Sequence, residues 1–251
     1  LVSYPDTQDF EASTDIPACF RANDEAGGYL WTVDSNGTGS ANTGPDIDNT
    51  LGNGNGNYIY AEASPSGVGD TAFLETQAAD LTALSSPELV FFYHMYGADI
   101  DALEVQVFNT STSQWDSIFA VAGQQQTSET NPFARVVLDL SSNASAFTRI
   151  RFVATKLGGE LADIALDDII FREQPTCPAP INLTTTNITA TDVDLAWTAP
   201  SPAPANGYDY EIVPAGNGQG NGVVTSGNVS STFVTATGLS AQTDYDAYVR
   251  A

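Results

Sequence analysis

Carboxylate side chains placed beside turns are the residues of this sequence best suited to chemistry. Five of them stand out by their setting: Glu11, Asp46, Asp48, Asp167 and Asp168. Oxygen donors on a loop that leads into a strand suit a hard cation such as Ca²⁺, which takes about six to eight oxygen ligands. An ordinary acidic surface loop contains the same residue types, so the chemistry depends on whether these segments meet in the fold.

Three acidic segments carry these carboxylates. Glu11 lies in a short segment expected to be a strand, Asp46 and Asp48 follow a Gly-Pro turn, and Asp167 and Asp168 are adjacent in an apolar segment. If the segments meet at one end of a β-sandwich, their carboxylates repel one another, and a bound Ca²⁺ relieves that repulsion. The alternative is that Asp167 and Asp168 alternate, one exposed and the other hydrogen-bonded to the backbone.

Catalytic motifs are missing from the sequence. His94 is the only histidine, and it lies in the most apolar segment, where we expect a core residue with a satisfied hydrogen bond. There is no second histidine for a metal triad and no Gly-x-Ser-x-Gly motif for a nucleophile. The sequence therefore predicts that this chain is not an enzyme.

The three tryptophans are expected to differ in their surroundings. Trp31 and Trp197 lie in strand-like segments and are best explained as core residues. Trp115 follows a polar stretch near an expected turn, which makes it the tryptophan most suited to exposure. An exposed aromatic ring offers a large apolar face for contact. Trp115 is therefore a candidate ligand contact, for example as a stacking platform for a sugar.

The composition excludes several classes of partner. The 251 residues include 31 Asp and Glu against 7 Lys and Arg, a formal net charge of −24. Nucleic acid and anionic membrane surfaces attract clustered basic residues, so neither is an expected partner. No apolar run approaches the roughly 18 residues of a membrane span. A single lysine, Lys156, and abundant Ser, Thr, Asn and Gly favour an extracellular protein.

Alternation of apolar and polar residues predicts strands throughout the chain and no sustained helix. The nearly continuous apolar run over residues 89–96 fits a strand covered on both faces. Residues 37–57 form a long Gly- and Asn-rich loop that must be either functional or pinned by something. The pattern predicts an antiparallel jelly-roll β-sandwich, then a Pro-rich linker over 173–180, then a second and smaller set of strands.

Six separated motifs occur in an order that resembles a known extracellular family. They are Phe10-Glu11, Gly44-Pro45-x-x-Asp48-x-Thr50, the 58–64 strand, Tyr93-His94-Met95-Tyr96-Gly97, the 150–152 strand and the acidic 163–169 segment. This series is similar to that of the MAM domain, named after meprin, the A5 antigen and receptor tyrosine phosphatase mu, and covers residues 1–174. The resemblance implies a jelly-roll sandwich whose structural cation ties the first strand and the long loop to the last strand. The ligands it implies are Glu11, Asp48 and Asp167, with Asp46 and Asp168 behind them.

The cysteines depart from the animal members of that family, which usually have four in two disulfides. This chain has only Cys19 and Cys177, which leaves either one bridge between them or none. Together with the acidity, this departure resembles the MAM domains of secreted bacterial proteins.

Residues 175–251 resemble a fibronectin type III domain, an immunoglobulin-like β-sandwich. The resemblance rests on Leu195-x-Trp197-x-x-Pro200, Tyr210-x-Ile212 and the segment from Gly238 to Ala251. It implies that Trp197 is the core tryptophan and Tyr245 the tyrosine-corner residue. It also implies that the last strand of this domain is missing or truncated.

These features together predict a non-catalytic adhesion or recognition segment of a larger secreted or surface protein. Its partner would be an extracellular protein or a glycan, and a homophilic contact is one form of the former. One alternative is a carbohydrate-binding accessory module of a secreted polysaccharide-degrading enzyme. Another is a spacer next to a protease domain.

Overall fold

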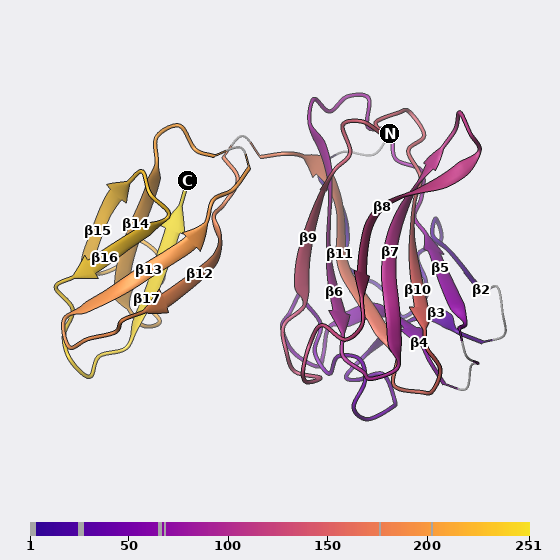
Figure 1. Cartoon of the computed structure of the whole chain (residues 1–251), viewed down its shortest axis with the longest axis horizontal. Coiled ribbons are helices and arrows are strands. Elements are labelled where there is room, and N and C mark those ends of the chain that lie inside the picture. Colours follow the sequence, from indigo (N-terminus) through magenta and orange to yellow (C-terminus); the bar gives the residue numbers. More distant parts are fainter. Residues whose placement is uncertain (1–3, 25–27, 65–66, 68, 176, 202) are drawn as a thin grey trace. The chain divides into compact units, whose positions relative to one another are not determined.

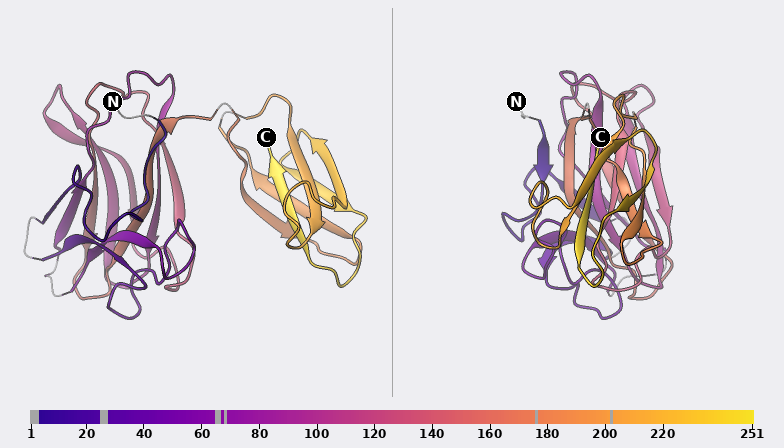
Figure 2. Two further views of the ribbon diagram at one scale, coloured as in Figure 1. Left: turned by 180° about the vertical axis from the view of Figure 1, so that it is seen from behind. Right: turned by 90° about the vertical axis from the view of Figure 1, so that its left-hand side faces the viewer.

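The chain folds into two compact units made only of strands and turns. The computed structural model describes residues 4–24, 28–64, 67, 69–175, 177–201 and 203–251. The units are Leu1–Glu173 and Gln174–Ala251. The described residues form strands β1 to β17 and contain no helix (Figure 1, Figure 2). This confirms the all-β class that alternating apolar and polar residues predict.

The first unit is a sandwich of two antiparallel sheets. One sheet has the order β3-β4-β11-β6-β9, with β1 also paired to β11; its strands are β1 (Asp6–Gln8), β3 (Leu30–Ser35), β4 (Asn57–Glu62), β6 (Pro87–Met95), β9 (Ala134–Asp139) and β11 (Ile164–Glu173). The other has the order β2-β5-β10-β7-β8; its strands are β2 (Arg21–Asp24), β5 (Thr71–Glu75), β7 (Ile100–Asn109), β8 (Gln114–Ala122) and β10 (Ile150–Lys156). Both sheets direct apolar side chains into one shared core, as the predicted jelly roll requires.

The core of this unit is dense in aromatic rings. Phe91 of β6 and Phe152 of β10 meet edge to face, with ring centroids 5.1 Å apart. β6 is almost wholly buried, as its apolar run predicts, because a second cluster around Tyr58, Tyr60 and Phe133 covers its outer face. The Tyr58 hydroxyl donates to the carbonyl oxygen of Pro45 at 2.8 Å. The long loop is thus packed against this second cluster.

Several local predictions differ from the structure. The strand expected around Glu11 is wrong: β1 ends at Gln8, and Phe10 has a positive φ of 58° that turns the chain out of the sheet. Strands β2 and β8 were not apparent from the sequence. β8 lies at a sheet edge, and edge strands are shaped less by burial, so its pattern is weaker than that of a central strand.

The second unit has two three-stranded antiparallel sheets. Their orders are β12-β13-β16 and β15-β14-β17, with strands β12 (Ile181–Thr186), β13 (Asp192–Thr198), β14 (Tyr208–Pro214), β15 (Thr225–Val229), β16 (Phe233–Thr237) and β17 (Tyr245–Arg250). Trp197 is buried and packs against Tyr208, with ring centroids 5.4 Å apart. The backbone N–H of Ser240 donates to the Tyr245 hydroxyl at 3.0 Å. Trp197 and Tyr245 therefore hold the positions expected of the core tryptophan and the tyrosine corner.

Candidate functional site

The acidic segments meet where β11 changes its partner strand. β1 pairs with β11 at residues 169–171, and β4 pairs with it at residues 164–166. Between these two stretches the register of β11 against β6 shifts, and Asp168 takes a positive φ of 46°. The bulge lets Leu166 and Ile169 both face the core. Asp167 and Asp168 are thereby left to face the long loop.

Both aspartates of the bulge hold that loop through hydrogen bonds. Asp167 is fully buried, and its Oδ2 accepts from the backbone N–H groups of Asn49 at 2.8 Å and Thr50 at 3.3 Å. Asp168 Oδ2 accepts from Asn49 Nδ2 at 2.6 Å, and its Oδ1 accepts from Thr50 Oγ1 at 2.9 Å. The alternation considered for these two residues is half right: Asp167 accepts from the backbone, whereas Asp168 is half-buried rather than exposed and accepts from side chains. Together they pin the loop to the last strand of the unit.

Asp48 organises the loop from within. Its side chain is buried, and its two carboxylate oxygens accept from the backbone N–H groups of Leu51 at 2.6 Å and Asn53 at 3.1 Å. Its own N–H donates to the Asn53 carbonyl at 3.2 Å. The carboxylate also lies against Gly56, where an added Cβ would overlap Asp48 Oδ2 and Cγ. The Gly- and Asn-rich composition thus makes room for a buried carboxylate.

Glu11 approaches the same place from the N-terminal side. Its Oε1 accepts from the backbone N–H of Asn57 at 2.8 Å. Burial raises the pKa of Glu11, the Asn57 hydrogen bond lowers it, and the charges of Asp48, Asp9 and Asp168 raise it. Burial likewise raises the pKa of Asp167 to about 8, against hydrogen bonds from the loop. This junction therefore concentrates carboxyl groups in a poorly solvated region, where burial disfavours their charged forms.

Asp46 does not belong to this group. It is exposed, and its N–H donates to the Glu129 carbonyl at 2.9 Å. Burial and the nearby charge of Glu129 raise its pKa. Of the five acidic residues singled out in the sequence, the structure brings together Glu11, Asp48, Asp167 and Asp168, and leaves Asp46 beside a different segment.

The donor set at the junction has the chemistry of a calcium site without its geometry. All four side chains are hard oxygen donors, which Ca²⁺ prefers. Among the residues that the structure describes, however, no three acidic, histidine or cysteine side chains are arranged closely enough to share a metal ion. Asp48 and Asp167 instead direct their oxygens at backbone N–H groups. Calcium at this junction stays a prediction.

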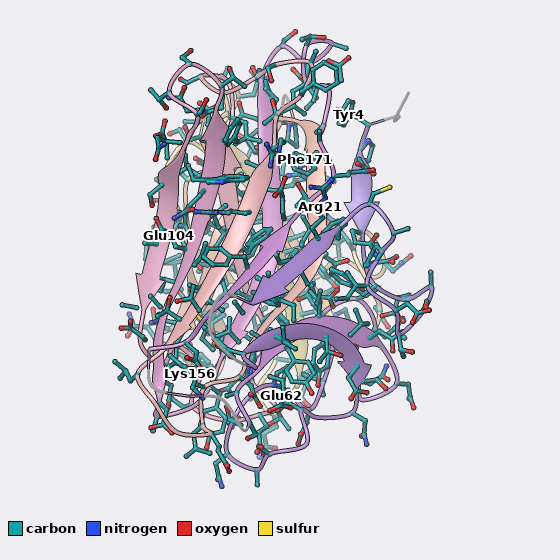
Figure 3. All side chains as sticks on the ribbon, turned by 90° about the vertical axis from the view of Figure 1, so that its right-hand side faces the viewer. Tyr4, Arg21, Glu62, Glu104, Lys156 and Phe171 are labelled. Atoms are coloured by element: carbon teal, nitrogen blue, oxygen red, sulfur yellow. The ribbon has the colours of Figure 1, made fainter. Side chains whose placement is uncertain are left out.

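A buried ionic network that the sequence did not suggest lies near Glu62. Lys156, the single lysine, is fully buried, and its Nζ donates to the carbonyl oxygens of Ala63 at 2.7 Å and Gly159 at 2.8 Å. Figure 3 shows Lys156 and Glu62 toward the same end of the unit. Asp163, also fully buried, accepts from Ala63 N–H at 2.8 Å and lies close enough to Lys156 to feel its charge.

Asp163 Oδ2 also accepts a hydrogen bond from the hydroxyl of Thr38, whose Oγ1 lies 2.5 Å away. It is therefore a second anchor for the start of the long loop. Only the three-dimensional packing shows that Asp163 and Lys156 are both fully buried.

Replacing Asp163 by asparagine is expected to alter how stability depends on pH. Burial raises the pKa of Asp163 from 3.8 to about 7, partly offset by its hydrogen bonds to Thr38 and Ala63 and by Lys156, while Glu62 raises it. Between pH 3.8 and pH 7 the folded state binds more protons than the unfolded state. The stabilisation from protonated Asp163 is therefore fully present below pH 3.8 and is lost as pH rises through 7. Over this range the contribution of Asp163 to the free energy of unfolding falls by up to about 1.4 kcal/mol per pH unit.

Urea unfolding at pH 5, 6.5 and 8 tests this expectation. The wild-type protein should lose more stability than Asp163→Asn between pH 5 and pH 8, so the free energy of unfolding of the wild type minus that of the variant should fall as pH rises. A difference that rises toward pH 8 would contradict the assignment.

A stack of rings and guanidinium groups surrounds Trp115. Trp115 lies in β8 next to a turn and is half-buried. The guanidinium carbons of Arg149 and Arg151 lie 5.2 and 4.4 Å from the centroid of its ring. Arg149 also lies over Phe108 at 4.6 Å, and Arg151 lies over Phe73 at 4.6 Å. The exposed-ring prediction for Trp115 is thus only half right, because neighbouring strands partly cover it.

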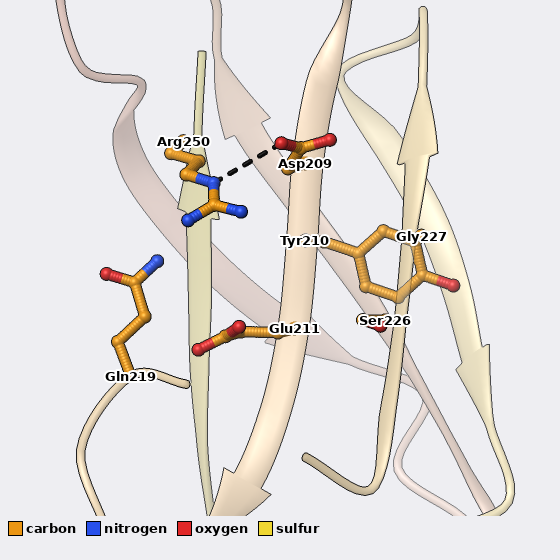
Figure 4. Close-up of a pocket in the computed structure, with 7 residues that line it drawn as sticks. All are labelled: Asp209, Tyr210, Glu211, Gln219, Ser226, Gly227 and Arg250. Atoms are coloured by element: carbon orange, nitrogen blue, oxygen red, sulfur yellow. Dashed lines mark hydrogen bonds and ion pairs between the residues drawn. The ribbon is translucent and has the colours of Figure 1, made fainter. Parts of the chain in front are cut away.

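The second unit contains a polar cavity of about 240 Å³ on the β15-β14-β17 sheet (Figure 4). Its charged groups already have partners within the unit. Arg250 Nε lies 3.3 Å from Asp209 Oδ2, and Glu211 Oε1 accepts from Gly220 N–H at 2.6 Å. Tyr210 lies opposite Gly227, where any added Cβ would press on the ring. The side chains that line this cavity are engaged in contacts within their own sheet. The stronger candidates for a functional site therefore lie in the first unit.

His94 and the cysteines carry no catalytic arrangement. His94 is fully buried, as predicted, but neither ring nitrogen has a hydrogen-bond partner among the described residues. Burial lowers its pKa to about 4, partly offset by the nearby backbone of Ser128, which raises it. Cys19 and Cys177 are both free and exposed, which is the unbridged alternative. No helix in the described ranges is long and apolar enough to cross a membrane.

Comparisons with known proteins place the chain. The family profile "MAM domain, meprin/A5/mu" matches residues 8–178, and "Fibronectin type III domain" matches residues 178–251. The chain is 31% identical over 170 residues to Neuropilin-1a of Danio rerio, covering 64% of this chain and 17% of that protein. It is 30% identical over 166 residues to MAM domain-containing protein 2 of Mus musculus, covering 66% of this chain and 23% of that protein. The chain therefore spans less than a quarter of the length of these relatives.

Among solved structures, the K1 cleaved adhesin domain of Lys-gingipain from Porphyromonas gingivalis W83 aligns with a TM-score of 0.46 and 14% identity. That alignment covers 69% of this chain and all of that one. The match to the MAM profile extends over more than half of the chain and agrees with its jelly-roll sandwich. The chain belongs to the MAM domain family, with a fibronectin type III domain after the MAM domain.

Proposed function

We propose that this chain is a non-catalytic, extracellular recognition or adhesion segment of a larger secreted or surface protein. The observation that supports it best is the outward face of the β2-β5-β10-β7-β8 sheet, which carries Trp115, Phe73 and arginine side chains. Tryptophan and arginine are the residue types that most often dominate the energy of binding surfaces. The acidic residues of the junction, in contrast, accept hydrogen bonds from the long loop and its flanks.

A cell-binding experiment tests this proposal. Fluorescently labelled chain should bind saturably to the surface of cells or to a second, bead-bound copy of the chain, and a Trp115→Ala variant should bind less. If the chain only separates other domains, as in the spacer alternative, neither surface should retain it. The carbohydrate-binding alternative is favoured specifically by the half-buried ring of Trp115, which has an apolar face of the kind that sugars contact.

The bacterial type also stays a proposal, supported by the pair of free cysteines and the net charge of −24. The relatives compared above by sequence are vertebrate proteins. Secretion is supported by the composition and by the family.

We also propose that the junction of Glu11, Asp48, Asp167 and Asp168 takes up a structural Ca²⁺. A ligand that binds only the folded state raises stability by about 2.7 kcal/mol at a hundred times its dissociation constant. Calorimetric melts of the first unit should therefore shift upward in Ca²⁺ relative to EDTA. Asp167→Asn should shrink the shift, whereas Asp46→Asn, at an exposed residue outside the junction, should leave it unchanged. Identical melts of the wild-type protein in Ca²⁺ and EDTA would rule the site out.

A further inference from the structure

The outward face of the β2-β5-β10-β7-β8 sheet, called the outer face below, has an ordered set of side chains. Strand register places Phe108 opposite Trp115, Gln106 opposite both Ser117 and Arg151, and Glu75 opposite both Arg151 and Arg21. Residues one position away on each strand, such as Val105 and Phe152, point into the core. The outer face therefore combines three aromatic rings with three arginines: Phe73, Phe108, Trp115, Arg21, Arg149 and Arg151.

The arginines of the outer face are held in place before any ligand arrives. Arg149 Nε and Nη2 lie 2.7 and 2.6 Å from Glu75 Oε1, and Arg151 Nε donates to Gln106 Oε1 at 2.6 Å. Both guanidinium groups also contact the Trp115 ring. Side chains fixed in this way lose little conformational freedom when a ligand binds, which favours affinity. A guanidinium carries five N–H donors, so Arg149 retains donors beyond the two groups that bond Glu75.

The charge of the outer face is opposite to that of the rest of the molecule. The chain has 7 Lys and Arg against 31 Asp and Glu, and three of those seven lie on this one face. Two carboxylates, Glu75 and Glu104, accompany them. Arg21 is exposed and forms no ion pair within the described part of the chain. Figure 3 views the unit from the side of β2 and labels Arg21 and Glu104. Three arginines and two glutamates give the outer face a formal charge of +1, so an anion meets less repulsion here than over the rest of this acidic chain.

We infer that the outer face binds an anionic polysaccharide, in which pyranose rings carry carboxylate or sulfate groups. This inference rests on the proposed recognition function and names its partner. A sugar ring lies with its C–H face against Trp115, and its acidic group pairs with Arg149 or Arg21. Arginine suits this role because its planar donors match carboxylate and sulfate oxygens.

Affinity electrophoresis and tryptophan fluorescence of the whole chain test the inference. The probes are polygalacturonate, chondroitin sulfate and neutral β-1,4-galactan, with the first two separating carboxylate from sulfate recognition. We expect at least one acidic polymer to retard the protein and to change its fluorescence, which responds through Trp115 because Trp31 and Trp197 are buried. Retardation should weaken as salt rises, since exposed charges are screened.

Two variants that change the charge of the outer face in opposite directions separate an effect on binding from an effect on folding. Arg21→Gln should weaken binding several-fold, and Glu104→Gln, on the same face, should strengthen it about two-fold, because each alters one charge outside the ring stack. Both variants should melt like the wild-type protein. Trp115→Ala should abolish the fluorescence change and reduce retardation at least ten-fold.

Three results would overturn the inference: retardation by galactan equal to that by the acidic polymers, equal effects of the two charge variants, or no retardation at all. If no polymer retards the chain but the chain still binds to cells, only the assignment of an anionic polysaccharide as the partner is overturned. Loss of both would overturn the proposed recognition function as well.

Discussion

Replacing Gly56 by alanine is expected to lower the free energy of unfolding of the MAM domain by about 2–4 kcal/mol, at the upper end of the range for overpacked sites. The expectation does not depend on backbone strain. An added Cβ would overlap the carboxylate of Asp48, which is itself buried and held by two backbone N–H groups. The carboxylate cannot move aside without losing those hydrogen bonds.

A double-mutant cycle with Asp48→Ala isolates this cause. Asp48→Ala alone should cost about 2–4 kcal/mol, because it leaves the N–H groups of Leu51 and Asn53 without their acceptor. In the Asp48→Ala background the overlap disappears, so Gly56→Ala should then cost much less than on its own. Urea unfolding of the four proteins gives the coupling energy. Strictly additive effects would show that Gly56 is needed for another reason. Asn55→Ala, in the exposed part of the loop, is the matched control and should be nearly neutral.

Replacing Lys156 by methionine is expected to cost about 3 kcal/mol, despite the close match in size. Methionine fills the volume but donates no hydrogen bonds, which leaves the carbonyl oxygens of Ala63 and Gly159 without those from Nζ. It also removes the positive charge near buried Asp163. Removing a buried positive charge near a carboxylate leaves the negative charge without that compensation, which is costly in a poorly solvated region.

A variant of Asp163 supplies the control. Lys156→Met combined with Asp163→Asn should be less destabilised than the sum of the single variants, because the uncompensated carboxylate is gone. The Lys156→Met penalty should also be larger at pH 8 than at pH 6, since Asp163, with a pKa near 7, is ionised at the higher pH. Chemical denaturation at both pH values measures this. A penalty independent of pH and of Asp163 would point to packing alone.

The sequence predicted the fold well because the pattern that specifies it is local. Alternation of apolar residues marks most strands, and the buried run over 89–96 marks the strand covered on both faces. The meeting of Glu11, Asp48 and Asp167 was implied by the resemblance to the MAM family. The hydrogen bonds from the loop to Asp167 and Asp168 depend on a one-residue bulge in β11, which no local sequence pattern predicts.

The features that the sequence could not predict depend on the pairing register of strands that are distant in the chain. The stack around Trp115 needs β10, β7 and β8 to align so that Arg149 and Arg151 flank one ring, and β8 itself was not apparent. Lys156 reads as a solvated lysine in sequence, because lysine is rarely buried without partners. Asp46 was grouped with Asp48 by proximity in the chain, whereas the loop turns between them and leaves Asp46 exposed.

The attachment of the long loop to β11 has a consequence for the order of folding. Asn49 and Asp167 are separated by 118 residues, so their hydrogen bond forms only after almost the whole domain has been assembled. Contacts between such distant residues close late and slow the folding of β-rich domains. During synthesis the hydrogen bonds from the loop to Asp167 and Asp168 cannot form until β11 has left the ribosome. Completion of the last strand therefore acts as the step that shields this segment, and the resistance of residues 37–57 to proteolysis reports directly on whether the domain has finished folding.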